Sequence, residues 1–241
     1  MRFMVMHKMT EEMERGLPPE PAIIKGVGAL IAEGLKDKIF LSGEGLKPSS
    51  ERVHVVYKNG QRTVTDGPFT EAKELVAGFA LMRVNSKEEA LSWCDKFAAV
   101  LGEVELFMGP VVEPWDIGLA PKPKNPPLRI LSMHKMDERA ENDTPPDAKD
   151  MQQMGALIEE MTKAGVLLAT DGLASTKKGA RIHYAGGKHT VVDGPFAESK
   201  ELVAGYAIIN VPSKAAAIEW ALRFGDVVKV NEIEVRQIPE W

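Results

Sequence analysis

Residues 66–79 read DGPFTEAKELVAGF, and residues 193–206 read DGPFAESKELVAGY, so the two stretches are 127 residues apart and identical at 11 of 14 positions. The same offset relates His7-Lys8-Met9 to His134-Lys135-Met136, and Trp93 to Trp220. A shared register over this length predicts two copies of one module, because solenoid repeats are shorter and more numerous. We place the first copy at residues 1–112, a proline-rich linker at 113–127 and the second copy at 128–241.

The composition is that of an ordinary globular protein, with 241 residues, a net charge of −5, 44% hydrophobic and 27% charged residues. The single cysteine, Cys94, excludes an internal disulfide framework and a cysteine-cluster metal site. No apolar run reaches the length that spans a bilayer, and the mild acidity disfavours nucleic acid as a partner. We therefore expect a cytoplasmic protein that binds neither membranes nor nucleic acid.

Each copy shows the same order of local patterns. A short apolar strand comes first, then a helix with apolar residues at helical spacing, then a second short strand. A hairpin follows, with Asn59-Gly60 or Gly186-Gly187 at its turn. A strand leads out of the DGPF stretch, Ser86 or Ser213 caps a second helix, and an alternating strand ends the copy. This order is typical of a ferredoxin-like split βαβ module, so the fold class is α+β.

The motif DGPFxExKE, with the glycine-containing strand after it and Gly43–Leu46 or Asp171–Leu173 before it, resembles the YCII-related superfamily, specifically its DGPF subfamily. The resemblance covers nearly the whole of both copies. It implies a dimeric α+β barrel, here formed within one chain by two ferredoxin-like modules packed as a pseudo-symmetric pair. The family has no firmly assigned activity, and some of its genes lie beside genes for extracytoplasmic-function sigma factors.

One feature that the resemblance implies is missing. The YciI type looks built around a histidine on the first helix and an acidic residue near that helix's end. Aligning the helix ends puts Ile23 at the histidine position of the first copy and Asp150 at that of the second. The proposed dyad is therefore not carried over to this chain.

The candidate catalytic residues are His7, Asp66, His134 and Asp193. Each histidine ends the first strand of its copy, where it could face a cleft and transfer a proton. The alternative is a strand-end histidine that hydrogen-bonds a neighbouring loop. Each aspartate opens a DGPF turn, and could act as a base or orient the imidazole. A structural role, with the carboxylate capping its own turn, is the favoured alternative.

Weaker candidates for ligand binding are four carboxylates. Two lie in glycine-flanked turns after a short strand, and two follow the DGPF turns, where a solvated run of Glu–Lys pairs is the simpler interpretation: Glu44, Asp171, Glu74 and Glu201. Five histidines and one cysteine make a structural zinc site improbable, and the sequence predicts no metal and no cofactor. Cys94 is expected to be a buried small hydrophobe.

Three functional hypotheses follow. The first is binding of a small molecule in a cleft between the two modules. The second is an isomerase- or lyase-like enzyme in which His7 or His134 moves a proton with the help of Asp66 or Asp193. It requires that each histidine and aspartate converge in one cleft. The third, a protein partner in sigma-factor-linked regulation, rests on the family resemblance alone. The sequence also leaves further homo-oligomerisation open.

Overall fold

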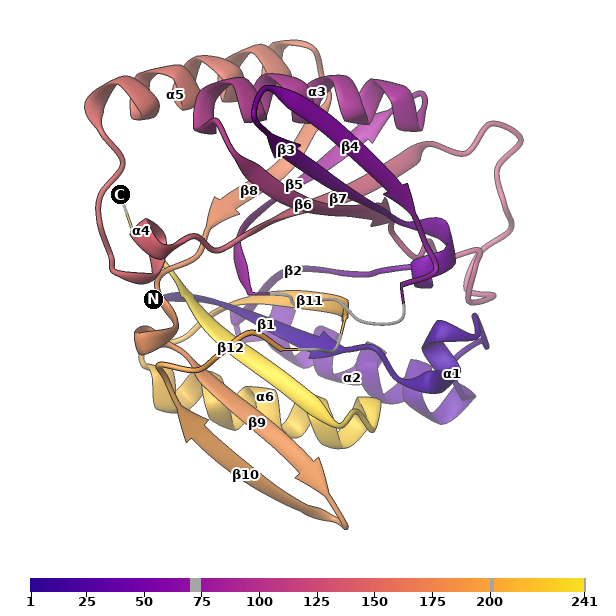
Figure 1. Cartoon of the computed structure of the whole chain (residues 1–241). Coiled ribbons are helices and arrows are strands. Elements are labelled where there is room, and N and C mark those ends of the chain that lie inside the picture. The colour runs from indigo at the N-terminus through magenta and orange to yellow at the C-terminus, as the bar shows by residue number, and fades with distance from the viewer. Residues whose placement is uncertain (70–74, 200–201, 241) are drawn as a thin grey trace.

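The chain folds into four layers, in which two β-sheets lie face to face and each carries a pair of helices on its outer side (Figure 1). The computed structural model describes residues 1–69, 75–199 and 202–240. The first sheet has the strand order β10 (Lys188–Asp193), β9 (Ala180–Ala185), β12 (Glu232–Ile238), β1 (Arg2–Lys8), β11 (Val203–Asn210) and β2 (Phe40–Gly45). The second has the order β4 (Gln61–Asp66), β3 (Val53–Lys58), β6 (Val104–Pro110), β7 (Leu128–Lys135), β5 (Val76–Val84) and β8 (Leu167–Gly172).

Each sheet is covered by two long helices. The long helices α2 (Pro21–Lys36) and α6 (Lys214–Val228) pack on the first sheet, and α3 (Lys87–Leu101) and α5 (Ala148–Lys163) pack on the second. The polar segments before α2 and α5 form the short helices α1 (Glu11–Glu14) and α4 (Glu138–Glu141). None of the helices in the described ranges is long and apolar enough to cross a membrane.

Local sequence signals account for several of these elements. The hydroxyls of Ser86 and Ser213 accept from the backbone N–H groups of Glu89 and Ala216, so both predicted helix caps are confirmed. Asn59 has a φ of 51° and the glycines at the two hairpin turns have φ of 58–72°, as a type I′ turn requires. The predicted α+β class with ferredoxin-like units is likewise confirmed.

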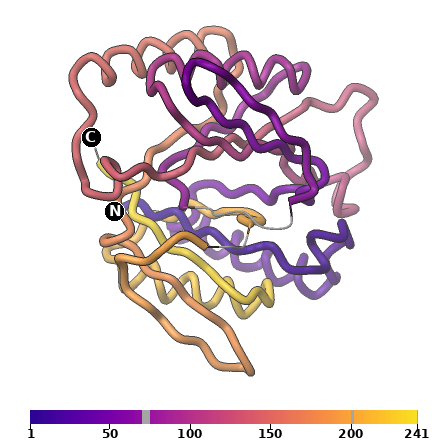
Figure 2. The backbone as a smooth tube through the Cα atoms, viewed as in Figure 1, coloured from indigo at the N-terminus to yellow at the C-terminus, as the bar shows by residue number. Residues whose placement is uncertain are grey.

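Each sheet mixes strands of both sequence copies. In the first sheet β1 and β2 come from the first copy and the other four strands from the second, and the second sheet has the reverse composition. Strand β1 pairs on one side with β11 and on the other with β12, while β7 pairs with β5 and β6. Figure 2 shows the resulting path of the backbone, which crosses between the layers. The ferredoxin-like units therefore do not coincide with the repeats, whose boundaries stay a prediction.

In the part of the chain that the structure describes, the two face-to-face sheets do not close into a barrel. Within the described residues the strands form two separate sheets, and β10, β2, β4 and β8 are edge strands with one paired side. The sheets touch through an isolated bridge between Leu46 and Val111, beyond the ends of β2 and β6. The space between them holds an apolar core that includes Met6, Leu131 and Tyr206. Packing of side chains, rather than a continuous ladder of hydrogen bonds, holds the sheets together.

A buried arginine occupies the same place in both sheets but comes from different segments, directly before β3 in one case and within β12 in the other. In the second sheet Arg52 lies on Gly109, where an added Cβ would be 2.5 Å from the arginine Cγ. In the first sheet Arg236 lies on Gly179, and the corresponding distance to its Cδ is 2.9 Å. Arg52 Nε donates to the carbonyl of Lys47 at 2.6 Å, and the guanidinium of Arg236 donates to that of Ala174, 127 residues further on. The two arrangements are equivalent with the strands exchanged.

Because the copies exchange strands, we expect them to stay together when the linker between them is cut. Residues 118–127 of the linker are exposed. A protease site inserted after Lys122 and then cleaved should leave both fragments bound to each other, because separating them would break the pairing of β1 and of β7 with their neighbours. Size-exclusion chromatography should show one peak before and after cleavage, with the fragments parting only in denaturant. Fragments that separate under native conditions would contradict the prediction, and the uncleaved insertion is the control.

Candidate functional site: a cavity under α3 and α5

The DGPF turns are held by close backbone contacts. A Cβ added to Gly67 would lie 1.9 Å from the carbonyl oxygen of Ser49, and one added to Gly194 would lie 1.8 Å from that of Thr176. Only glycine fits there. The backbone N–H of Phe69 then donates to Ser49 Oγ at 3.0 Å, and Phe196 donates to Thr176 Oγ1 at 3.2 Å. The described part of the motif thus binds each hairpin end to the short 3₁₀ turn that precedes the hairpin.

The carboxylates of these turns lie at the surface. Asp66 accepts from Lys87 Nζ at 3.0 Å and Asp193 accepts from Lys214 Nζ at 2.6 Å, while their side chains are 72% and 70% exposed. Each ends an edge strand and faces the lysine that opens the following helix, rather than capping its own turn. Such exposed pairs contribute little to stability.

The histidines lie elsewhere. His7 and His134 are on the central strands β1 and β7 and face the helices, because they share a strand face with Val5 and Ile130 in the two helix-covered cores. The structure therefore does not bring either histidine together with an Asp of a DGPF turn, which the enzyme hypothesis requires.

His7 is partly buried on the helix-covered side of the first sheet, and its Nδ1 has no hydrogen-bond partner among the described residues. Its ring meets Phe224 of α6 edge-on, with 5.6 Å between ring centroids. It also covers Gly205, where a Cβ would be 2.7 Å from the imidazole Nε2. Desolvation by burial lowers the pKa of His7 to about 4. The imidazole is therefore neutral at pH 7 and serves as a packing group.

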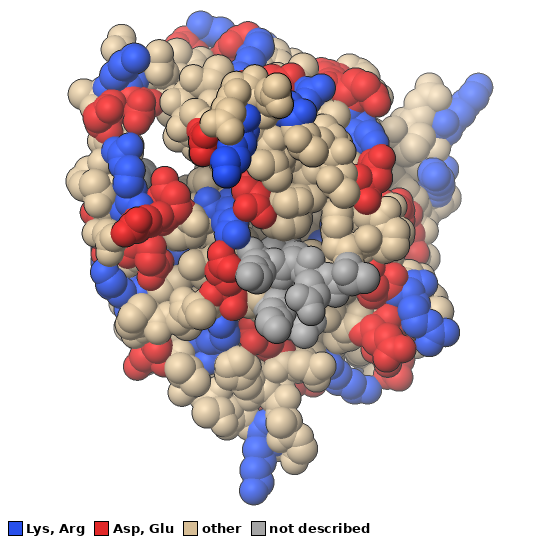
Figure 3. All heavy atoms as spheres, in the orientation of Figure 1, with Lys and Arg blue, Asp and Glu red and all other residues tan. Residues whose placement is uncertain are grey.

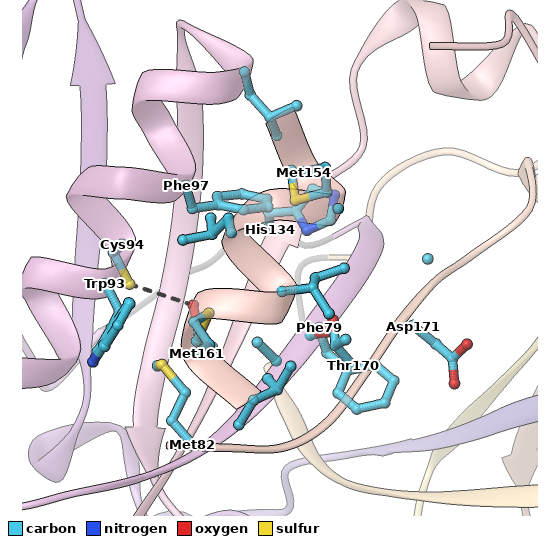
Figure 4. Close-up of a pocket in the computed structure, with 18 of the residues that line it drawn as sticks. Phe79, Met82, Trp93, Cys94, Phe97, His134, Met154, Met161, Thr170 and Asp171 are labelled. Atoms are coloured by element: carbon cyan, nitrogen blue, oxygen red, sulfur yellow. Dashed lines mark hydrogen bonds between the residues drawn. The ribbon is translucent and has the colours of Figure 1, made fainter. Parts of the chain in front are cut away.

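His134 has the equivalent position and a different surrounding. Desolvation by burial lowers its pKa to about 4 as well. Its ring lies 5.1 Å from that of Phe97, and no described residue makes a hydrogen bond to it. The residue nevertheless keeps accessible surface, because it lines a cavity (Figure 4). A neutral imidazole thus presents one donor and one acceptor to an internal space.

The cavity has a volume of about 510 Å³ and lies between α3, α5 and the second sheet. Such a volume is within the range of sites that hold small molecules. Copies one and two both contribute, since α3 and β5 belong to the first and β7, β8 and α5 to the second. Figure 4 shows the side chains of Trp93, Phe97 and Met154 around it (Figure 4). The aromatic and sulfur-bearing side chains of the lining include Met82, Trp93, Cys94, Phe97, Met154 and Met161.

The charge of the lining is one-sided. No lysine or arginine lines the cavity among the described residues, and its charged members are Asp150 and Asp171. Asp171 is neutralised by Arg2, whose guanidinium donates to both carboxylate oxygens at 2.7 and 3.0 Å. Asp150, on the first turn of α5, has no such partner in the described structure. An anion would therefore meet apolar groups and a negative charge, with no cation to compensate its loss of water.

A second cavity of about 480 Å³ adjoins the first and shares Leu101, His134, Pro146 and Asp150 with it. Its other walls are polar and include Tyr57, Lys135 and Arg139. His134 thus stands at the border between an apolar and a polar space. In the face shown in Figure 3, charges of both signs are interspersed over the surface (Figure 3).

The predicted carboxylates have mainly structural partners. Glu44 of β2 binds Arg129 of β7, which also binds Glu113 at 2.7 Å, and burial raises the pKa of Glu44. The pair Arg2–Asp171 is its pseudo-symmetric equivalent. Each pair connects the two sheets, and of these two carboxylates Asp171 lines the cavity. Glu74 and Glu201 lie outside the described residues.

Cys94 is buried, as predicted, and burial raises its pKa to about 11. Its Sγ lies 3.8 Å from Ser132 Oγ at the wall of the cavity (Figure 4). The thiol is protonated at neutral pH and is no nucleophile there. In the described residues no group of three or more His, Cys, Asp or Glu is placed to hold a metal ion.

Sequence reasoning identified His134 and Asp171 but not the cavity they line. The signal it could have used is the difference between the copies along α5. Met151, Met154 and Met161 stand where the first copy has Ile24, Val27 and Gly34. Unbranched methionine side chains fill irregular spaces adaptably, and their concentration on one helix is typical of an adaptable binding surface.

Two comparisons with known proteins give matches. The family model described as "YCII-related domain" matches residues 1–106 and 129–241. An uncharacterised protein of Rhizobium meliloti (strain 1021) is 32% identical over 75 residues, which are 31% of this chain and 60% of that relative. The aligned part of the chain thus spans about three fifths of that relative's length. No solved structure matches.

The buried histidines make a prediction about pH. The pKa of His134 is about 4 in the folded chain, below its ordinary 6.5, so the unfolded chain binds more protons between these values. The contribution of the neutral His134 to the free energy of unfolding is complete above pH 6.5 and falls as the pH drops toward 4. Between about pH 7.5 and about pH 5, the loss for one such histidine is on the order of 2 kcal/mol.

His134→Leu should reduce the pH dependence of the free energy of unfolding by that amount, measured by urea unfolding at both pH values. His189→Gln, which changes an exposed histidine of β10, is the control and should retain the dependence of the native chain. An unchanged pH dependence in His134→Leu would show that the folded protein already protonates this imidazole at pH 5.

Proposed function

The chain belongs to the YCII-related family, and from this premise and the cavity we propose that it binds a small, neutral, mostly apolar molecule beneath α3 and α5. We also propose that it belongs to the DGPF subfamily, which the motif at residues 66–69 and 193–196 supports. A cytoplasmic location and a regulatory protein partner stay predictions.

One observation carries the binding proposal. The imidazole of His134 is neutral, partly buried and without a hydrogen-bond partner in the described structure, and it faces a cavity of about 510 Å³. Its ring can offer one donor and one acceptor to a molecule in that cavity. A ligand with one hydroxyl, phenol, amide or carbonyl group would supply a partner for it. The lining then selects the rest of that molecule.

The apolar part of the ligand is selected by polarizable groups. Trp93 and Phe97 offer aromatic faces, and the methionines of α5 offer flexible thioethers that make favourable contacts with ring edges. A flat ring system suits this combination better than an aliphatic chain. The missing cation in the described lining and the carboxylate of Asp150 disfavour carboxylates and phosphates as ligands.

Binding is the better hypothesis because proton transfer lacks its second group. Asp66 and Asp193 lie at exposed edge-strand ends in ion pairs with Lys87 and Lys214. Asp150 and Asp171 line the cavity, but Asp171 is already bound to Arg2, and Asp150 makes no hydrogen bond with His134 in the described structure. The geometry therefore favours recognition of a neutral group by His134 over acid–base chemistry by a His–Asp pair.

The test compares two probes of similar shape, 2-naphthol and 2-naphthoate, by isothermal titration calorimetry. We expect 2-naphthol to bind at least about tenfold more tightly, since burial of an unpaired carboxylate costs several kcal/mol. His134→Leu should weaken 2-naphthol binding by about five- to tenfold through loss of one hydrogen bond. His7→Leu, the same change in the other helix layer, is the matched control. Equal or tighter binding of the carboxylate would refute the proposal.

A second prediction uses Gly155 of α5, which lines the cavity. A Cβ at Gly155 would meet no atom within 4 Å, and its φ is not in the left-handed region. Gly155→Leu should therefore fold normally, with a melting temperature equal to or above that of the native chain, because leucine is the better helix former. The added side chain should lower 2-naphthol affinity at least about tenfold by filling the space.

The matched control is Gly28→Leu. Gly28 holds the equivalent position on α2, and a Cβ there also meets no atom within 4 Å. This variant should keep native affinity. If Gly155→Leu binds 2-naphthol as the native chain does, the probe occupies some other part of the protein.

A further inference from the structure

The two helix layers are alike at one end. Arg223 of α6 binds Glu33 of α2 at 2.6 Å, and Lys96 of α3 binds Glu160 of α5 at 2.5 Å. The second pair is the first displaced by 127 residues along the chain. The layer on the first sheet and the layer on the second sheet therefore start from the same helix pairing.

At the other end the layers differ. Lys229, directly after α6, binds Glu20, directly before α2, at 2.9 Å. The equivalent residues in the second layer are Gly102 and Asp147, and a glycine has no side chain with which to form this pair. Helices α2 and α6 are thus connected at both ends by ion pairs, whereas α3 and α5 lack the equivalent of the second one.

Helix spacing differs at the same end. A Cβ added to Gly26 of α2 would be only 2.8 Å from Val227 Cγ1 of α6, so the two helices are in close contact there. The residues at the equivalent positions are Gln153 and Val100. A glutamine cannot take the place of a glycine in such a contact without moving the helices apart. Leu101, Pro146 and Asp150, which line both cavities, lie at this end of α3 and α5.

The interior of the first layer is packed with aromatic and branched side chains. Trp220 stacks on Phe224 with 5.4 Å between centroids and 13° between planes. Ile23 and Val27 pack against the same core, whereas the second layer has Asp150 and Met154 there. Tyr184 lies over Gly225, where a Cβ would be 2.2 Å from its hydroxyl.

In the second layer Ala98 replaces Gly225 and Tyr57 replaces Tyr184. The Tyr57 hydroxyl donates to Asp95 at 2.8 Å, and the tyrosine lines the polar cavity. The added methyl group of alanine thus occupies the place over which the other tyrosine lies. Each of these differences removes contacts from the second layer and retains them in the first.

We infer that the chain binds one ligand and not two, because Gly26 and Lys229 hold the layer of α2 and α6 closed while Gln153 and Gly102 leave the layer of α3 and α5 open. This inference rests on the proposed function, because that proposal is what says that the chain binds a ligand. The difference between an open and a closed layer can be measured without any ligand.

The measurement uses the single cysteine. Cys94 lines the open layer, and Ala221 holds the equivalent position under α6. The two proteins to compare are the native chain and the double variant Cys94→Ala with Ala221→Cys. Each protein is treated with methyl methanethiolsulfonate at pH 9, and the rate at which its cysteine reacts is measured. That rate is divided by the rate for the same cysteine in the protein unfolded in urea. We expect Cys94 to react at least about tenfold faster than the cysteine introduced at position 221, because the reagent can enter the cavity beside it.

A second set of variants tests the cause. Gly26→Gln with Lys229→Gly, added to the chain with its cysteine at position 221, should raise the reactivity of that cysteine toward that of Cys94. Gln153→Gly in the native chain should lower the reactivity of Cys94. Circular dichroism and melting temperature show whether each variant is folded. The native comparison stands without these variants.

The outcomes separate the two proposals. Equal cysteine rates, or calorimetry that finds two equivalent 2-naphthol sites per chain, would overturn the inference and leave the proposed function intact. One site per chain with unequal cysteine rates supports both. If neither naphthalene probe binds, the proposed function fails, and the cysteine rates still decide whether one layer is open and the other closed.

Discussion

The pairing of β1 with β11 and β12, and of β7 with β5 and β6, is the contact on which the remaining structure depends. These are the central strands of the two sheets, and each is supplied by the opposite sequence copy from its neighbours. Neither copy can complete its sheet alone in this arrangement. The ion pairs Arg2–Asp171 and Arg129–Glu44 add to that dependence, because each joins one sheet to the other.

The same strands also position the histidines. A central strand places a side chain far from solvent, and desolvation then lowers the pKa of His7 and His134 alike. Each ring packs against the equivalent phenylalanine of a helix, Phe224 or Phe97, and His134 in addition lines the cavity. The functional difference that we propose between these identical residues would thus arise from their surroundings and not from the chemistry of the residue.

Much of the fold could be predicted from sequence because it depends on local signals. Asn59-Gly60 and the serine caps of α3 and α6 are decided by neighbouring atoms, and the structure has them where predicted. The exchange of strands could not be predicted, since near-identical copies present the same pattern to either partner. Whether the two sheets close into one barrel could not be predicted either, because closure depends on whether edge strands meet, which alternation of side chains does not report.

The site was predicted in part for a similar reason. The position of His134 near a strand end is visible in the sequence, but the cavity beside it depends on how closely the helices above it pack, which no local pattern reports. Asp66 and Asp193 were grouped with the histidines because they recur with them. Recurrence identifies what the fold retains as readily as what the function requires, and the structure places these aspartates in exposed ion pairs rather than beside the histidines.

The exchanged arginine has a consequence for how the gene can change. Arg52 requires Gly109 opposite it, and Arg236 requires Gly179, so the two halves of the gene encode the same contact in opposite order. Gene conversion that copied the strand β3 region over that of β9 would set two arginines against each other, and conversion in the other direction would leave two glycines and a hole. Two fully identical repeats could therefore not form this contact in both sheets.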